Sequence, residues 1–174
     1  MGPMQSLVAL LRAVNVGGTG KLAMDDLVAI CEAAGFCTVR TYIASGNAVF
    51  ESASGVAETK NTLEARLQSF TGRSITVIVR TAGEMAEILE GNPFPDAPGK
   101  RVVVIFLDRL TSPADLTGVT GQGADEAIQL GNREIYIRYG SGMARSKLRI
   151  PAAEAGTARN MNTVSKLATM AAAG

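Results

Sequence analysis

Apolar residues in the first half of the chain follow strand-like and helix-like spacings in turn. A near-continuous apolar run at 6–13 is typical of a strand covered on both faces. Downstream, helical spacings alternate with β-branched and aromatic runs. In chain order, the pattern predicts a strand at 6–13, a helix from Met24 to Ala34 closed by Gly35, strands at 38–43 and 48–51, a helix from Val56 closed by Gly72, and a strand at 75–79.

This order of elements is that of the split βαβ arrangement of ferredoxin-like domains, an α+β fold with an antiparallel sheet. In that topology the first and second strands run the same way, so their C-terminal ends share one edge. We therefore expect the polar segment 15–21 and the turn Ser45-Gly46-Asn47 to be neighbours. Helices cover one face of such a sheet. Because the first strand is apolar throughout, we expect the second half of the chain to cover the other face.

The second half repeats part of this pattern. A helix is predicted over 82–90 and a proline-rich connector over 93–99. Then follow a strand at 102–107, a short helix opened by Ser112-Pro113, strands at 126–130 and 134–139 around Gly131-Asn132, and helices near 142–148 and 160–172. We interpret the chain as two ferredoxin-like subdomains packed together, at 4–81 and 82–174. The second is degenerate, with a helix where its fourth strand would be due.

Composition and charge limit the classes of function. Seventeen basic and sixteen acidic residues leave a net charge of +1, so no global field draws the protein to nucleic acid or an anionic membrane. The longest apolar runs are far too short to span a bilayer, and we expect a soluble cytoplasmic protein with no membrane partner. With no histidine and two cysteines, no metal site or cofactor is expected, and Cys31 is interpreted as a buried free thiol.

Four spaced stretches of this sequence resemble a bacterial family known as domain of unknown function 1697. They are LLRAVNVGG (10–18), TYIASGNAVF (41–50), YGSGMARSKL (139–148) and TARNMNTVSKL (157–167), and the resemblance runs from about Ser6 to the end of the chain. It implies two ferredoxin-like α/β subdomains and brings no established activity. Met161 departs from the family pattern, which usually has tryptophan there.

The glycine-rich segment after the first strand differs from a phosphate loop. Asn15 stands where that loop requires glycine, and Leu22 replaces its metal-binding serine or threonine. One interpretation is that backbone N–H groups near Gly17 and Gly18, together with Lys21, hold an anion. The other is that these glycines only permit a tight connection. Likewise, Ser45 and Asn47 either orient a ligand or serve as turn residues.

The last predicted helix carries one polar stripe. Its residues Arg159, Asn162, Thr163 and Lys166 have helical spacing and include no acid, which fits either a solvated face or an anion-binding surface. We predict a small anionic, phosphate- or nucleotide-like ligand in a cleft between the two halves. The candidate ligand-binding residues are Arg12, Asn15, Gly17, Gly18, Lys21, Tyr42, Ser45, Asn47, Arg145, Lys147, Arg159, Asn160, Asn162 and Lys166.

The sequence names no reaction. Without a histidine, Ser45 has no evident base to activate it, and Tyr42 is better interpreted as a packing residue than as a proton donor. Two alternatives to a small ligand stay open: a module that binds single-stranded nucleic acid, and a structural or assembly protein without a ligand. The oligomeric state is not set by the sequence.

Overall fold

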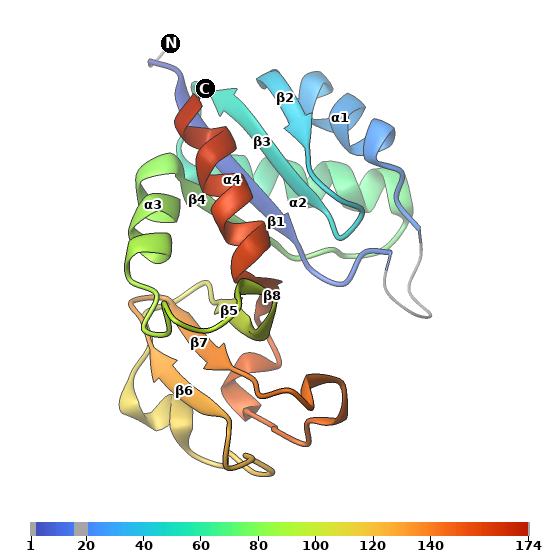
Figure 1. Ribbon diagram of the computed structural model, residues 1–174. Helices are drawn as coiled ribbons and strands as arrows, with labels where there is room; N and C mark the ends of the chain where they lie inside the picture. Colours follow the sequence, from blue (N-terminus) through green and yellow to red (C-terminus); the bar gives the residue numbers. More distant parts are fainter. Residues whose placement is uncertain (1–2, 16–20, 174) are drawn as a thin grey trace. The chain divides into compact units, whose positions relative to one another are not determined.

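The computed structural model describes residues 3–15 and 21–173, and the chain divides into two compact units (Figure 1). Unit 1 comprises Met1–Ala86 and Lys166–Gly174, and unit 2 comprises Glu87–Ser165. The last helix therefore begins in unit 2 and ends in unit 1. In place of a single break near residue 82, the C-terminal segment of the chain returns to the first unit.

Unit 1 is built on a four-stranded antiparallel sheet in the order β2-β3-β1-β4. Its elements are β1 (Gln5–Leu11), α1 (Met24–Ala33), β2 (Cys37–Thr41), β3 (Asn47–Ser52), α2 (Val56–Thr71), β4 (Val77–Thr81) and the first part of α3 (Ala82–Glu90). The predicted succession of strands and helices is confirmed. Because β1 and β2 both run antiparallel to β3, they run in the same direction, and their C-terminal ends lie at one edge of the sheet.

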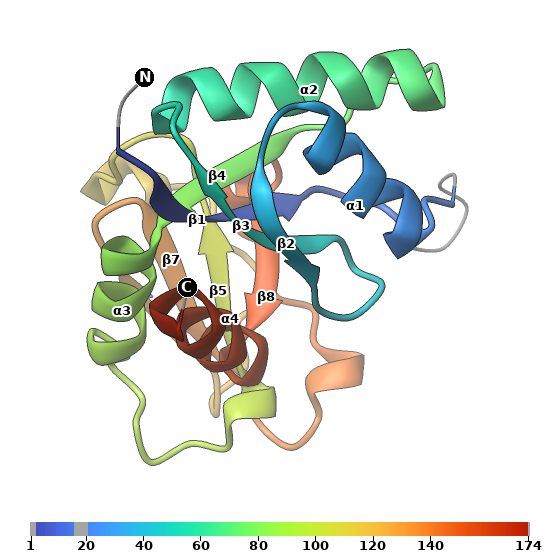
Figure 2. The ribbon, with the colours of Figure 1, turned by 90° about the horizontal axis from the view of Figure 1, so that it is seen from above.

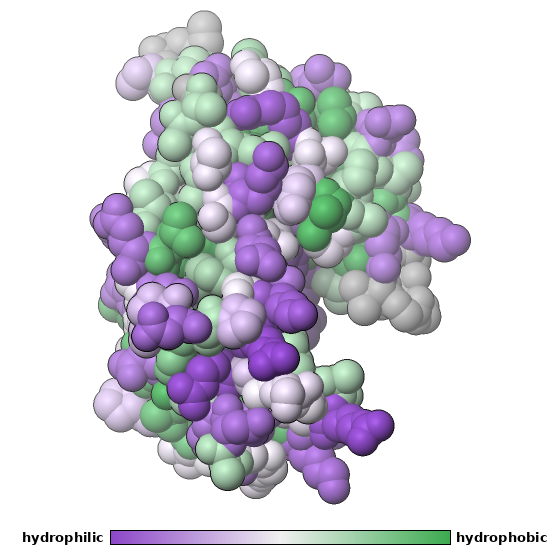
Figure 3. All heavy atoms as spheres, viewed as in Figure 1, coloured by the Kyte–Doolittle hydropathy of each residue, from purple (hydrophilic) through white to green (hydrophobic). Residues whose placement is uncertain are grey.

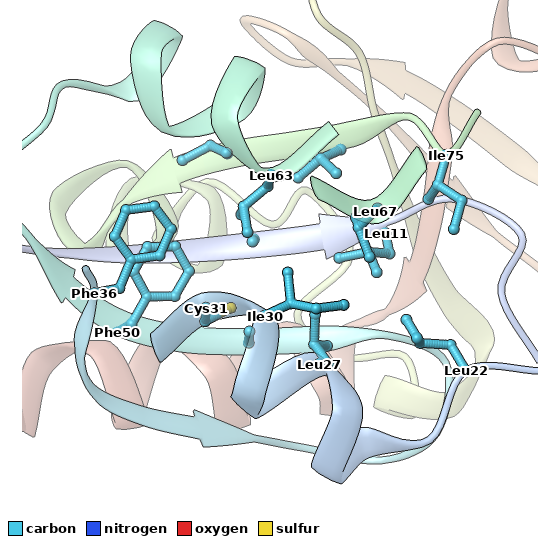
Figure 4. Close-up of a cluster of buried hydrophobic side chains, with 14 of the residues drawn as sticks. Leu11, Leu22, Leu27, Ile30, Cys31, Phe36, Phe50, Leu63, Leu67 and Ile75 are labelled. Carbon is cyan, nitrogen blue, oxygen red and sulfur yellow. The ribbon is translucent and has the colours of Figure 1, made fainter. Parts of the chain in front are cut away.

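The two faces of this sheet bury different sets of residues. Every side chain from Leu7 to Leu11 is fully buried. Leu7, Ala9 and Leu11 belong to the apolar core formed with α1 and α2, where Leu27 and Leu63 also lie (Figures 2 and 4). Each large aliphatic side chain buried in this way contributes about 1.5–3 kcal/mol.

The C-terminal end of α4 (Met161–Ala173) is attached to the same unit. The hydroxyl of Ser6 donates to the Ala171 carbonyl at 2.9 Å, and Nη2 of Arg40 donates to the Met170 carbonyl at 3.2 Å. Ser6 has the strand parity opposite to that of Leu7, so this helix end lies toward the face that α1 and α2 leave. A segment from the second half of the sequence therefore helps to cover that face, as expected.

Unit 2 contains a second four-stranded antiparallel sheet, in the order β6-β7-β5-β8. The strand order is that of unit 1 when β5 to β8 are matched to β1 to β4. Its elements after α3 are η1 (Gly99–Arg101), β5 (Val102–Phe106), η2 (Pro113–Leu116), β6 (Ala127–Leu130), β7 (Glu134–Arg138), η3 (Met143–Arg145), η4 (Pro151–Ala153), β8 (Thr157–Asn160) and the start of α4.

The prediction that a helix replaces the fourth strand of the second half was wrong, because β8 is that strand. Thr157 and Arg159 are buried and Ala158 between them is exposed, which is the two-residue period of a strand. Four residues of this pattern are hard to detect beside the longer helical pattern that follows. The helix predicted near 142–148 is a single 3₁₀ turn, η3. Unit 2 thus has all four strands of the pattern seen in unit 1. Between those strands it has short 3₁₀ turns where unit 1 has the helices α1 and α2.

The two cysteines lie in different environments and are both free. Cys31 is buried in the core of unit 1, as predicted, and burial, with a smaller contribution from Glu32, raises the pKa of its thiol to about 12. Cys37 is exposed.

Among the residues that the structure describes, no helix has the length and apolar character needed to cross a membrane.

Candidate functional site

Asn15 joins the segment after β1 to the turn after β2. Its Nδ2 donates to the carbonyls of Leu22 at 2.7 Å and Ala44 at 2.8 Å, and its Oδ1 accepts from the Leu22 N–H at 2.7 Å. Asn15 also has a φ of 56°, in the left-handed region that asparagine tolerates better than most residues. Asn15 and the turn after β2 are therefore neighbours, as the strand directions require, whereas residues 16–20 of the predicted polar segment lie outside the described residues. Both amide hydrogens of Asn15 are used within the protein.

Asn47 closes the turn between β2 and β3. Its side chain is fully buried, and Nδ2 donates to the Tyr42 carbonyl at 2.8 Å and to the Ser45 hydroxyl at 3.1 Å. The backbone N–H of Tyr42 donates in return to the Asn47 carbonyl at 3.1 Å. Gly46 adopts the special dihedral expected of it, with a φ of 94°. These contacts explain Asn47 and Ser45 as residues that form the turn.

Unusual backbone conformations gather at this edge. Besides Asn15 and Gly46, Ala13 and Ile43 have positive φ values of 55° and 53°. A β-branched residue in this region is strained, and the sequence pattern did not reveal it. Arg12 and Lys21, both exposed, are the candidate cations here. The predicted anion-holding glycines, Gly17 and Gly18, lie outside the described residues.

The polar stripe predicted on the last helix does not form. Arg159 lies on β8, one residue before Asn160, whose Oδ1 accepts from the Thr163 N–H at 2.9 Å and so caps α4. The Arg159 side chain is 8% exposed, and burial lowers its pKa to about 10. Its Nη1 donates to the Ala158 carbonyl at 2.8 Å.

The other members of that stripe are also dispersed. Thr163 is buried in unit 2, whereas Lys166 is exposed and belongs to unit 1. Asn162 is exposed but lies against η1, since a Cβ atom at Gly99 would come within 2.1 Å of its Oδ1. Met161, which stands at the tryptophan position of the resembling family, is buried.

A pocket of about 260 Å³ lies between two glycine-rich loops of unit 2, at 120–126 and 139–147. It brings together Arg145 and Lys147, both predicted as ligand-binding residues. The pocket is lined by Gly121, Gly123, Asp125, Glu126, Gly140, Gly142, Arg145, Ser146 and Lys147. Loop 120–126 is absent from the predicted site residues, although its closely spaced glycines beside an acidic pair, Gly121 to Glu126, are a signal in the sequence.

Glu126 holds the two loops of this pocket together. Its carboxylate is buried, accepting from the Gly123 N–H at 2.7 Å and from the Ser146 hydroxyl. Its carbonyl accepts from Nε2 of Gln122 at 3.0 Å. Burial, together with the nearby Glu126 charge, raises the pKa of Tyr139. The Glu126 carboxylate therefore already accepts hydrogen bonds from Gly123 and Ser146 at the side of the pocket.

Two glycines allow the loops to approach each other closely. Gly121 has a φ of 71°, and a Cβ atom there would lie 2.0 Å from the Lys147 carbonyl oxygen. A Cβ atom at Gly140 would lie 1.6 Å from Oδ2 of Asp125. Side chains at either position would force the loops apart, so the shape of the pocket depends on both glycines.

Three exposed charged side chains of the pocket remain available to a ligand. Within residues 3–15 and 21–173, Asp125, Arg145 and Lys147 make no side-chain hydrogen bond or ion pair. The pocket can therefore offer two cations and one carboxylate. The described residues contain no group of three or more acidic or cysteine side chains placed to hold a metal ion.

Replacing Glu126 with alanine is expected to destabilise the protein by about 1–3 kcal/mol, because the Gly123 N–H and the Ser146 hydroxyl lose their acceptor. Glu126→Gln is the matched control. Glutamine keeps one acceptor for Gly123, and the serine hydroxyl can rotate to accept from the new amide, so we expect less than about 1 kcal/mol. Urea unfolding measures both. An alanine variant as stable as the wild type would contradict the conclusion that Glu126 holds the two loops together.

This chain is similar to known proteins in both sequence and structure. The chain is similar to a solved structure described as conserved bacterial protein SP0830 from Streptococcus pneumoniae, with 24% identity, a TM-score of 0.81 and coverage of 97% of this chain and 99% of that one. No curated protein matches the sequence. The model of the family described as protein of unknown function DUF1697 matches residues 4–136, a range that ends before the last two resembling stretches. The chain therefore belongs to the DUF1697 family.

Proposed function

We propose that this protein binds a small phosphate-like anion in the pocket of unit 2, with Arg145 and Lys147 as the groups that hold it. The observation that carries the proposal is that one pocket is lined by two cationic side chains that have no ion-pair partner among the described residues. Glu126 lines it too, but its carboxylate is already engaged by Gly123 and Ser146. Against the two cations stands Asp125 alone, which leaves the available charge of the pocket positive.

The size of the pocket favours a small anion over a whole nucleotide. Its volume of about 260 Å³ is below the roughly 300–1,000 Å³ of pockets that hold drug-sized ligands. Four of its lining residues are Gly121, Gly123, Gly140 and Gly142, so a ligand can come close to the backbone. A phosphate or a short phosphate ester fits these limits better than the nucleotide-like ligand also considered from the sequence.

The two alternatives have less support. A sheet that binds single-stranded nucleic acid stacks bases on exposed aromatic side chains. Here the central strand residues Leu7–Leu11 and Val102–Phe106 are buried, and the exposed Phe70 lies on a helix. An assembly surface calls for a contiguous apolar patch. On the face drawn in Figure 3, apolar residues are interspersed among hydrophilic ones.

Two finer descriptions belong to the same proposal. The strand order shared by the two sheets supports describing each unit as a ferredoxin-like subdomain. The two free cysteines support a reducing compartment such as the cytoplasm. We assign no reaction to the protein.

The test is a thermal-shift titration with inorganic phosphate and ethyl phosphate. A ligand at 100 times its dissociation constant adds about 2.7 kcal/mol of stability, which is readily seen as a rise in melting temperature. We expect the double variant Arg145→Ala/Lys147→Ala to lose this rise. Lys100→Ala, which removes an exposed cation elsewhere in unit 2, should retain it. No rise with either anion, or a rise that survives the double substitution, would refute the proposal.

A further inference from the structure

The Asp125 carboxylate reaches from one loop of the pocket to the other. A Cβ atom at Gly140 would lie 1.6 Å from its Oδ2 and 2.7 Å from its Oδ1, so the carboxylate occupies the space that a side chain at 140 would fill. It lines the same pocket as Arg145 and Lys147. Despite this shared pocket, Asp125 forms no ion pair with either cation within the described part of the chain.

The pocket therefore presents both signs of charge, and the described residues form no ion pair between them. An exposed ion pair contributes little to stability, so these side chains stay available to a ligand. The second carboxylate of the pocket belongs to Glu126, which is buried and accepts hydrogen bonds from Gly123 and Ser146. Asp125 is therefore the negative group that meets a ligand, and a purely anionic ligand would be repelled by it.

A ligand with both signs of charge would use all three groups. We propose that the ligand is a small zwitterion, in which a short linker joins an anionic group to an ammonium. The anionic group pairs with Arg145 and Lys147, and the ammonium pairs with Asp125. This inference rests on the proposed anion site and adds the requirement for a positive group. The pocket volume of about 260 Å³ suits a molecule as small as phosphoethanolamine.

Isothermal titration calorimetry with two matched probes tests the inference. O-Phosphoethanolamine and ethyl phosphate share the phosphate ester, and the first adds an ammonium. We expect the wild-type protein to bind O-phosphoethanolamine more tightly by a factor of up to about five, the upper end of the gain from an exposed ion pair. Asp125→Asn keeps the shape of the side chain and should abolish this preference while binding ethyl phosphate at least as tightly as before. Asp96→Asn, at an exposed aspartate outside the pocket, should leave the preference unchanged.

The outcomes separate this inference from the proposed function. If neither probe binds, the anion site itself is refuted and the zwitterion with it. If both bind equally, or if the preference persists in Asp125→Asn, the anion site stands and the zwitterion is refuted. The same chemistry occurs in lipid headgroups, and we assign the free molecule. Asp125-dependent sedimentation with phosphatidylethanolamine vesicles would overturn that assignment, and no sedimentation would support it.

Discussion

Gly46→Ala is expected to lower the free energy of unfolding by about 2–5 kcal/mol. Two costs add. Gly46 has a φ of 94°, which is costly for any residue with a Cβ atom. That Cβ atom would also lie 2.6 Å from Cγ2 of Val14 and 2.9 Å from Cβ of Leu11, both fully buried. Because both neighbours belong to the core of unit 1, the clash can be relieved only by moving the edge where β1 and β2 end.

Gly35→Ala separates these two costs. Gly35 has nearly the same φ, 93°, but nothing lies within 4 Å of the Cβ atom that it would gain. We expect Gly35→Ala to cost about 1–2 kcal/mol, from the backbone alone. The difference between the two variants in urea unfolding then measures the packing at the edge. Equal losses of stability would show that the close approach of Gly46 to Val14 and Leu11 carries no energetic weight.

Asn15→Ala is expected to destabilise the protein by about 2–4 kcal/mol. The substitution removes two donated hydrogen bonds and one accepted bond that tie Leu22 and Ala44 to the end of β1. It also places alanine at a φ of 56°, where asparagine is better tolerated. Guanidinium or urea unfolding, with the slope of the transition checked for constancy, gives the change directly.

Asn15→Asp is the control for the donated bonds. Aspartate tolerates the left-handed conformation and keeps the acceptor for the Leu22 N–H, but it cannot donate to the carbonyls of Leu22 and Ala44. At neutral pH its carboxylate would face these two carbonyl oxygens and repel them, so we expect Asn15→Asp to be at least as destabilised as Asn15→Ala. An alanine variant within about 0.5 kcal/mol of the wild type would mean that the hydrogen bonds from Asn15 to Leu22 and Ala44 do not stabilise the fold.

The first half of the fold could be predicted because its elements are long and regular. Helices such as α2 present many turns of apolar spacing, and the hairpin turn at Gly46 is marked by residues suited to it. The proximity of Asn15 and Ala44 followed from strand direction alone. The sequence pattern did not show which groups the side-chain amides of Asn15 and Asn47 bind. Sequence shows a polar side chain, and the structure shows that Asn15 donates to two backbone carbonyls while Asn47 donates to the Tyr42 carbonyl and the Ser45 hydroxyl.

Short elements account for the errors in the second half. β8 has four residues and runs directly into α4, so Arg159 was interpreted as part of a helix. The boundary depends on the cap that Asn160 forms, a contact that spacing alone does not reveal. Arg145 and Lys147 were identified as local cations, but their common pocket with Asp125 arises from two loops that approach at Gly121 and Gly140, and that approach is a tertiary feature.

Binding of a small anion between the glycine-rich loops of unit 2 is tested most directly by NMR. Backbone amide chemical shifts are followed during a titration with ethyl phosphate. We predict concentration-dependent shifts for Gly121, Gly123, Gly140 and Gly142, and their absence in Arg145→Ala/Lys147→Ala. Unchanged glycine amides at saturating phosphate ester, or shifts confined to unit 1, would contradict the account.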